Sequence, residues 1–412
     1  MKIFIFLVFV LLGIGRNLPF QYFYFFGLGV ADILFCLLSL LLLCNANSRQ
    51  ALQHEITVLR KPIIAIVCIS ALAMASLAFN VWIYDVKGTD ILENLRYFYL
   101  LTVMVVTSHC TRTTGMVPAV GFVVGVIISG VVAFLNPMNP DVLGTPQIFN
   151  PNVIGNVLSV SIVYCSFAIL SGYTVYGALL AVCATVIAFF TFSKGTWLMS
   201  TFAIIACNLA LKSLGSRNTS LSFKYGKYLA YIVFATLLYV VYEFWGVVSL
   251  IVEAKIAATD FEASAVGGGS FSARVGLILS SIYMFLMNPL LGVGISNFEH
   301  VNHLLESDLG AAYYDDDNPN SAWFYVLGCM GLPAFILFTW VFYWFLRRLY
   351  RIPVVNPKTR FWYTACVGIV FFIGGNIQGE MLAAYYYWVA LGIVAALSTS
   401  NKGGVLSFVS NK

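Results

Sequence analysis

Long apolar runs alternate with short polar segments along almost the whole chain. A run of roughly 18–25 apolar residues can cross a hydrocarbon core about 30 Å thick as a helix, and the strict alternation that marks a membrane β-barrel is missing. The pattern predicts an all-α integral membrane protein with about twelve transmembrane helices, or about eleven because polar residues interrupt the fourth run. The predicted spans are about 3–15, 20–44, 62–84, 95–109, 116–135, 153–171, 174–192, 196–212, 228–251, 321–346, 361–375 and 382–399.

The composition agrees with this pattern. The chain is 60% hydrophobic and 9% charged, with a mean hydropathy of +0.90, whereas a soluble domain carries about 25% charged residues. No long polar domain stands at either end, so residues 1–412 are predicted to form a single polytopic membrane domain. The first apolar run resembles a signal peptide, but no small-residue cleavage site precedes Arg16, which predicts a retained first helix.

One long polar stretch, from Ile251 to Ser321, interrupts the apolar pattern. It contains about half of the 17 acidic residues and two of the four histidines. The stretch predicts a large loop over 252–320 with short helices between two spans. Ser272 is a suitable N-cap for one such helix over 272–287.

The basic residues divide the loops into two groups. Most of the 22 Lys and Arg residues fall on the side of the termini, where Glu55 is the one acid. The positive-inside rule makes this side cytoplasmic, together with both termini, and places the large loop outside the cytoplasm. The segments assigned to the cytoplasmic side are 45–61, 110–115, 213–227, 347–360 and 400–412.

Metal and nucleotide chemistry are not expected. The nine cysteines lie in apolar runs or at their ends without a CxxC pair, as small core residues do. His300 and His303 are three positions apart, but two histidines are a weak signal because zinc sites use three or four ligands. The chain contains neither a Walker sequence nor a GxGxxG motif after a strand, so no cofactor is predicted.

Two cations on the extracytoplasmic side are candidates for binding phosphate. Arg274 stands at the start of the predicted helix over 272–287 and offers a planar fork of donors, which suits a phosphate group; the alternative is a surface arginine at a helix start. Lys194 stands where the span over 196–212 begins, and its alternative is a lysine that reaches to the membrane interface. Arg96 is interpreted as an ordinary membrane-edge charge.

The candidate carboxylates lie in and near the large loop. Asp316 and Asp317 belong to an acidic run that could supply a general base, hold a divalent cation or form a solvated turn. Glu380, in the loop before the last predicted span, is a further candidate. Asp32 and Glu243 lie inside predicted spans, where a carboxylate suggests function.

Four segments, in this order, resemble the O-antigen ligase/polymerase superfamily of bacterial membrane proteins, and most of all its Wzy-type polymerases. The resemblance covers roughly residues 140–400, and the order of the segments is more specific than any one of them. The first segment, Phe149–Asn156, opens a span like the family's Asn-Pro-Asn segment, and the second, Thr191–Leu198, is similar to its Ser-Arg-Gly element. The third is Arg274 followed by the Asn-Pro-Leu-Leu-Gly-Val-Gly block before Phe298. The fourth is Pro319–Pro333, where the family has His-Asn, a span and a Gly-Leu-x-Gly turn.

The resemblance implies a metal-independent inverting glycosyltransferase with the membrane-embedded C-type fold. Such an enzyme moves a glycan from undecaprenyl diphosphate at the periplasmic face of the bacterial inner membrane. Arg274 and Lys194 occupy places where the family binds the lipid diphosphate, and Lys194 keeps the charge without the bidentate fork. Asn320 stands where ligases generally carry a histidine associated with acceptor activation. This difference favours a polymerase, although a shifted alignment would give that role to His303.

The leading hypothesis is an O-antigen or surface-polysaccharide polymerase whose donor and acceptor are both undecaprenyl-diphosphate-linked oligosaccharides. Arg274, Asp316, Asp317 and Asn320 are its predicted catalytic residues, and substrate binding is assigned to Lys194, Arg274, His300, His303 and Glu380. Membrane lipids and a chain-length regulator protein are the expected partners, without nucleic acid. The alternatives are a ligase that transfers glycan to lipid A-core and, in a different class, a transporter that flips lipid-linked glycans.

Overall fold

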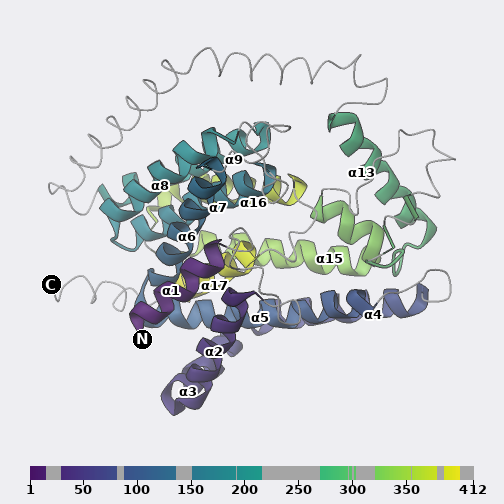
Figure 1. The fold of residues 1–412 in the computed structure, drawn as a ribbon, viewed down its shortest axis with the longest axis horizontal. Helices are drawn as coiled ribbons and strands as arrows, with labels where there is room; N and C mark the ends of the chain where they lie inside the picture. Colours follow the sequence, from purple (N-terminus) through teal and green to yellow (C-terminus); the bar gives the residue numbers. More distant parts are fainter. Residues whose placement is uncertain are drawn as a thin grey trace.

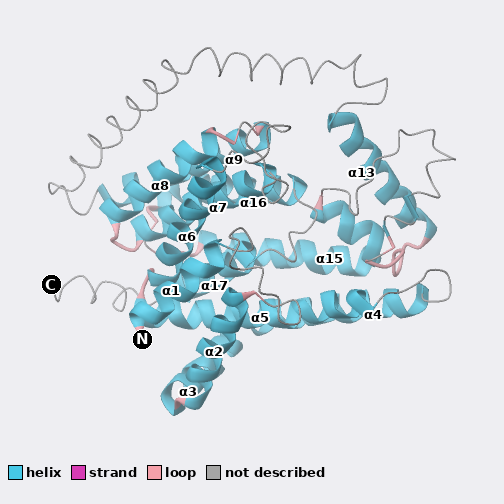
Figure 2. Ribbon diagram, in the orientation of Figure 1, coloured by secondary structure: helices cyan, strands magenta, loops and turns pink. Residues whose placement is uncertain are grey.

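The computed structural model describes residues 1–14, 29–80, 88–135, 151–191, 193–215, 270–295, 297–298, 301–302, 321–353, 355–377 and 385–399. All regular secondary structure in these residues is α-helical (Figure 2). The helices are α1 (Lys2–Ile14), α2 (Val30–Cys44), α3 (Ala46–Val58), α4 (Arg60–Asn80), α5 (Gly88–Thr114), α6 (Val117–Leu135), α7 (Pro151–Leu170), α8 (Thr174–Phe189), α9 (Lys194–Gly215), α13 (Ser270–Met287), α15 (Ala322–Tyr350), α16 (Pro357–Ile377) and α17 (Tyr385–Thr399).

Helices occur in the predicted spans, except that 228–251 lies outside the described residues. Helix α3 forms where a loop was predicted, and α13 corresponds to the short helix predicted over 272–287. Among the described residues, four helical segments are long and apolar enough to cross a membrane, and up to six spans result if each of two bent helix pairs is one span. The four segments are Arg60–Asn80, Val153–Leu170, Lys194–Leu214 and Ala322–Tyr350. The protein is therefore an all-α membrane protein, while the number of twelve spans stays a prediction, as does the 252–320 loop, most of which lies outside the described residues.

Helix α7 lies at the centre of one group of helices, where it packs against α6, α8, α9 and α16 (Figure 1). Small residues allow close approach in this group, as at the contact of α1 with α6. A Cβ atom on Gly125 of α6 would come within 2.0 Å of the Val10 carbonyl oxygen of α1. Because lipid tails are as apolar as leucine, such close packing, rather than burial of apolar surface, holds membrane helices together.

A buried ion pair joins three helices at one end of the bundle. Glu55 of α3 is 1% exposed and accepts from Arg112 Nε of α5 at 2.5 Å and from Ser108 Oγ at 2.6 Å. Arg112 Nη2 also donates to Thr399 Oγ1 of α17 at 2.7 Å. The contact brings together the segments 45–61 and 110–115 and the end of the last helix. Charge counting assigned all of these to one side of the membrane.

Candidate functional site

The first two family-like segments contact each other where α7 and α9 begin. Gly155 of α7 faces Thr196 of α9 so closely that a Cβ atom on Gly155 would lie 1.8 Å from Thr196 Oγ1. One turn further along, Ser159 Oγ and Ser200 Oγ are 2.9 Å apart. Thus only glycine fits at position 155, and this contact fixes how the start of α9 sits on α7.

Lys194 is the first residue of α9, and its side chain is exposed. The turn before it is held by Trp197, whose indole stacks on Phe189 with ring centroids 5.4 Å apart and donates to the Phe189 carbonyl oxygen at 3.0 Å. Ser193 Oγ accepts from the Thr196 amide at 3.4 Å. A helix N-terminus carries partial positive charge. The ammonium group of Lys194 adds to it, so the start of α9 favours the binding of an anion.

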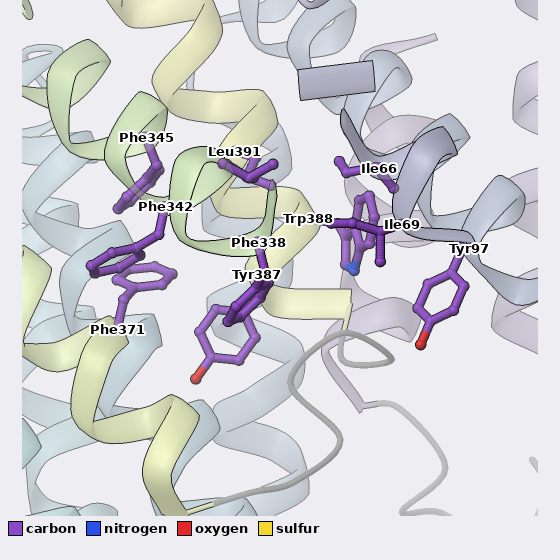
Figure 3. A pocket seen from close by; sticks show the side chains of 11 residues that line it. Ile66, Ile69, Tyr97, Phe338, Phe342, Phe345, Phe371, Tyr387, Trp388 and Leu391 are labelled. Carbon is purple, nitrogen blue, oxygen red and sulfur yellow. The ribbon is translucent and has the colours of Figure 1, made fainter. Parts of the chain in front are cut away.

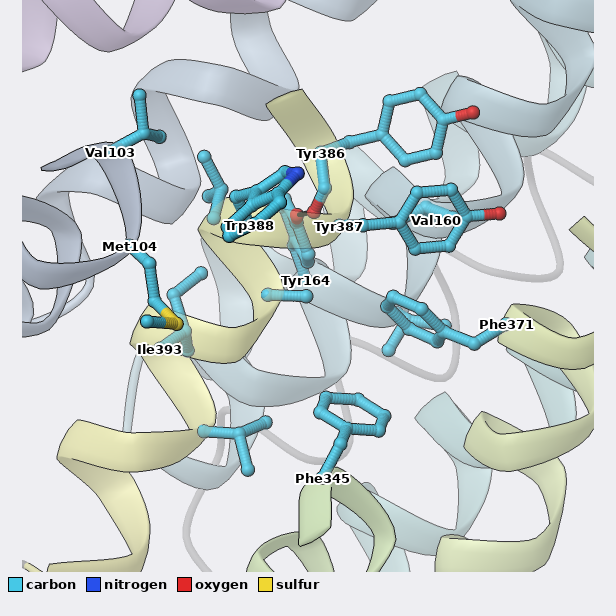
Figure 4. Close-up of a cluster of buried hydrophobic side chains, with 14 of the residues drawn as sticks. Val103, Met104, Val160, Tyr164, Phe345, Phe371, Tyr386, Tyr387, Trp388 and Ile393 are labelled. Atoms are coloured by element: carbon cyan, nitrogen blue, oxygen red, sulfur yellow. Dashed lines mark hydrogen bonds between the residues drawn. The ribbon is translucent and has the colours of Figure 1, made fainter. Parts of the chain in front are cut away.

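The start of α7 also meets the end of α16 and the start of α17. Asn156 Nδ2 donates to the Gly374 carbonyl oxygen at 3.2 Å and to Tyr386 Oη at 3.1 Å. The Tyr164 hydroxyl, further along α7, donates to the Tyr386 carbonyl oxygen. Figure 4 shows Tyr386 and Tyr387 projecting from α17 among the buried side chains of this region. The sequence singled out Asn156 only as part of a motif, and its partners lie more than half the chain away.

The start of α15 belongs to the same region. Ser321 Oγ donates to Asn376 Oδ1 of α16 at 3.0 Å. We refer to Asn156, Thr196, Ser321, Asn376 and Tyr386 as the polar end cluster. It gathers the starts of α7, α9, α15 and α17 and the end of α16, and Lys194 lies at its edge.

The third and fourth family-like segments form a second contacting pair. The Val293 amide donates to the Gly328 carbonyl oxygen at 3.1 Å, and the Gly294 amide donates to the Cys329 carbonyl oxygen at 2.9 Å. The Leu332 amide donates to the carbonyl oxygen of Pro289 at 2.8 Å. The turn after α13 thereby supplies donors to backbone carbonyl groups that the break in α15 leaves without helical partners.

Two glycines make this docking possible. Gly331 has φ +78° and interrupts the helical backbone of α15, and Gly292 in the facing turn has φ +66°. A Cβ atom on Gly292 would come within 2.3 Å of the Cys329 carbonyl carbon, and one on Gly331 within 2.5 Å of the Leu290 carbonyl carbon. Both positions need glycine for conformation and for space.

Arg274 lies on α13, which begins at Ser270 rather than at the predicted Ser272. Helix α13 packs against α15, whereas α9 packs against α7, α8 and α16, and Figure 1 shows α13 apart from α9. The structure therefore places Lys194 and the helix of Arg274 in two different pairs of motifs. The shared role of Arg274 and Lys194 stays a prediction.

The other predicted site residues lie outside the described residues: His300, His303, Asp316, Asp317, Asn320 and Glu380. Glu243 lies outside them as well. In the part of the chain that the structure describes, no group of three or more His, Cys, Asp or Glu residues could hold a metal ion.

Asp32 has a structural explanation that the sequence did not give. It is buried in α2, where Tyr99 Oη and Tyr385 Oη both donate to its Oδ1, at 2.9 and 2.6 Å. The Gly29 amide donates to Oδ2 at 2.9 Å. Hydrogen-bonded on both oxygens, the carboxylate joins α2, α5 and α17.

A family model described as O-antigen ligase matches residues 179–339. The matched range includes α9 with Lys194, α13 with Arg274 and the paired glycines Gly292 and Gly331. No curated protein matches the sequence. The match supports the resemblance to the O-antigen ligase/polymerase superfamily and suggests a glycosyltransferase-like enzyme that acts on lipid-linked glycans.

Proposed function

We propose that the protein is a polymerase of lipid-linked glycan repeats at the periplasmic face of the bacterial inner membrane. The donor is a glycan chain on undecaprenyl diphosphate, and the acceptor is a single repeat on the same lipid. A hydroxyl oxygen of the acceptor attacks the donor's anomeric carbon. The bond from that carbon to the diphosphate oxygen breaks, undecaprenyl diphosphate leaves, and the configuration inverts.

The observation that carries this proposal is the ordered contact between family-like segments. Gly155 and Thr196 hold Lys194 at the start of α9, and the glycine-dependent docking of 288–294 on α15 lies within the matched range. Negative charge develops on the leaving diphosphate, so fixed cations that meet it lower the barrier. We assign this task to Lys194 and Arg274.

The remaining roles follow the sequence. Asp316 or Asp317 takes the proton of the attacking hydroxyl, and His300, His303 and Glu380 contact the sugars. Asn320, where ligases generally carry histidine, is placed beside the acceptor and favours the polymerase over the ligase. These assignments rest on the resemblance and the positions of the residues along the chain.

A ligase that transfers the finished glycan to lipid A-core is the second candidate, and the description of the matching family model favours it. A transporter has less support from the described residues. It would need charged side chains along a central path, but Asp32 is hydrogen-bonded on both oxygens.

The test compares Lys194→Met with Lys212→Met, which removes a lysine from the last turn of the same helix. Each variant complements a deletion strain, and surface glycan is resolved on gels. Loss of polymerase leaves single repeats on the lipopolysaccharide, whereas loss of ligase leaves none. We expect Lys194→Met and Arg274→Ala to give single repeats and Lys212→Met to give the normal ladder.

A second assay uses purified protein with lipid-linked repeats and no ATP, and formation of new glycosidic bonds is expected. Normal chain lengths in both Lys194→Met and Arg274→Ala would overturn the roles of these cations. If the deletion strain makes lipopolysaccharide without any glycan repeat, the protein is the ligase and not the polymerase.

A further inference from the structure

An apolar pocket lies between α4, α5, α15, α16 and α17. Its lining is almost entirely apolar, and part of its space is open to the surroundings. Figure 3 shows Ile66, Ile69 and Tyr97 facing the aromatic residues of α15 and α17 across this space. The lining residues are Ile66, Ile69, Tyr97, Phe338, Val341, Phe342, Phe345, Phe371, Tyr387, Trp388 and Leu391.

Arg96 stands next to this pocket. It directly precedes Tyr97 on α5, and its guanidinium carbon lies 5.8 Å from the ring centroid of Tyr385, one turn before Trp388 on α17. The side chain is half-buried. Within the described ranges, the ion pair of Glu55 with Arg112 is the sole one, so Arg96 has no carboxylate partner there.

The position of Arg96 along α5 matches a membrane boundary. Arg112 lies on the same helix at the end marked by Glu55, and at about 1.5 Å per residue the two arginines are about 24 Å apart along the axis. A hydrocarbon core is about 30 Å thick. Arg96 therefore lies near the opposite boundary, where the phosphate of a lipid reaches it while the lipid chain extends into the apolar interior.

A series of contacts through the polar end cluster links Lys194 with Arg96. Lys194 is next to the contact of Gly155 with Thr196, Asn156 binds Tyr386, and the neighbouring Tyr385 faces Arg96. Both cations are predicted to lie at the extracytoplasmic side. A reaction between two lipid-linked glycans needs two lipid phosphates, each held by its own cation.

We infer that the pocket and Arg96 form a second lipid subsite, which takes the polyprenyl chain and the phosphate of the acceptor. The assignment of acceptor rests on the proposed polymerase function. The binding of a polyprenyl phosphate does not rest on that function. It follows from an apolar pocket, its aromatic lining and an arginine that forms no ion pair with an acid among the described residues. The guanidinium gives two parallel charge-assisted bonds to a phosphate.

The first experiment labels purified protein in nanodiscs with polyprenyl monophosphate that carries a diazirine in its chain. We expect cross-links to peptides containing Ile69, Phe342 or Trp388, and at least tenfold less labelling in Arg96→Gln. The control is Arg360→Gln, because Arg360 also lies over a tyrosine ring, at 5.7 Å from Tyr350, but outside the pocket. Melting temperatures confirm that both variants fold.

Two further arms separate the possible outcomes. Leu391→Trp fills the pocket and should reduce labelling, whereas Ile336→Trp on an exposed face of α15 should not. Unlabelled polyprenyl phosphate should compete, and phosphatidylglycerol should compete at least tenfold less. Labelling outside the pocket, labelling unchanged in Arg96→Gln, or equal competition by phosphatidylglycerol would overturn the subsite.

A kinetic arm tests the assignment to the acceptor. In the transfer assay, Arg96→Gln should raise the KM for the single lipid-linked repeat about tenfold and leave the KM for the donor unchanged. The reverse pattern would give the subsite to the donor. If no transfer occurs with any variant, the proposed function fails, while Arg96-dependent labelling still establishes the lipid-phosphate site.

Discussion

Tyr385 Oη donates a hydrogen bond of 2.6 Å to Asp32 Oδ1, although the two residues are 353 positions apart. The same oxygen accepts from Tyr99 at 2.9 Å. A carboxylate inside a membrane bundle is costly and usually marks a transport or catalytic path. Here donors from three elements meet it, so it connects the first part of the chain with the last helix.

Replacement of Asp32 should weaken the fold. Asp32→Ala leaves the hydroxyls of Tyr99 and Tyr385 without their acceptor, and each unsatisfied buried group costs about 1–3 kcal/mol. Asp32→Asn keeps one acceptor oxygen and should lose less stability. Thermal melting in detergent measures the order, and equal melting temperatures for the two variants would contradict this account.

The glycines at the docked turn should be intolerant of alanine. Gly292→Ala or Gly331→Ala places a side chain on a backbone with positive φ, which costs about 1–2 kcal/mol, and also causes a clash with facing backbone. Gly276→Ala is the matched control, because a Cβ atom at Gly276 meets nothing within 4 Å. Melting temperatures should fall for the first two and stay equal or rise for the control.

The contact of Gly155 with Thr196, next to Lys194, can be tested by moving the glycine from one helix to the other. Gly155→Ala should destabilise the protein by about 1–3 kcal/mol because it overpacks the contact with Thr196. Adding Thr196→Gly removes the three atoms that lie nearest to the new Cβ. The double variant should recover both the melting temperature and the glycan ladder. Failure to recover either would show that the contact is not the cause.

The ion pair of Glu55 with Arg112 should depend on both partners. Arg112→Leu leaves the buried carboxylate of Glu55 uncompensated and should cost about 3 kcal/mol or more. Arg112→Leu with Glu55→Leu should cost less, since no charge is then left unpaired. Unfolding free energies of the single and double variants measure these losses. A larger loss of stability in the double variant than in Arg112→Leu would contradict the role of the ion pair.

Lys194→Arg introduces the residue type that the resemblance to the family implies at this position. The variant should keep or raise the transfer rate, because arginine binds phosphate through two parallel bonds. Lys194→Met should lower kcat by about 10²–10³, the usual effect of removing one group that stabilises developing negative charge. Single-turnover rates at saturating donor measure both, and a slower Lys194→Arg than Lys194→Met would exclude a phosphate contact.

The sequence predicted the apolar helices well because their length and hydropathy are local properties. It missed α3, whose residues Ala46–Val58 are too polar for a hydropathy criterion, although Asn45 accepts from the amides of Asn47 and Ser48 as an N-cap. It also gave no sign that Arg96 lies over the ring of Tyr385, because the two residues are far apart in the chain. Contacts between distant segments leave no trace in a single sequence.

The paired glycines are the exception. Gly292 and Gly331 belonged to segments noted for their similarity to a family, and the structure shows that both have positive φ and face each other's backbone. The resemblance located the turn, but local spacing could not reveal that it docks onto the break in α15. The sequence likewise could not predict that Glu55 is buried, because its partner Arg112 lies on another helix.

The position of α17 has a consequence for biogenesis. Asp32 and Arg112 both bind residues of this helix, Tyr385 and Thr399. At about 5–20 residues per second, a ribosome reaches Tyr385 roughly 20–70 s after Asp32. During that interval α2 and α5 lack these contacts. A helix made about 350 residues later therefore completes the contacts of helices made among the first.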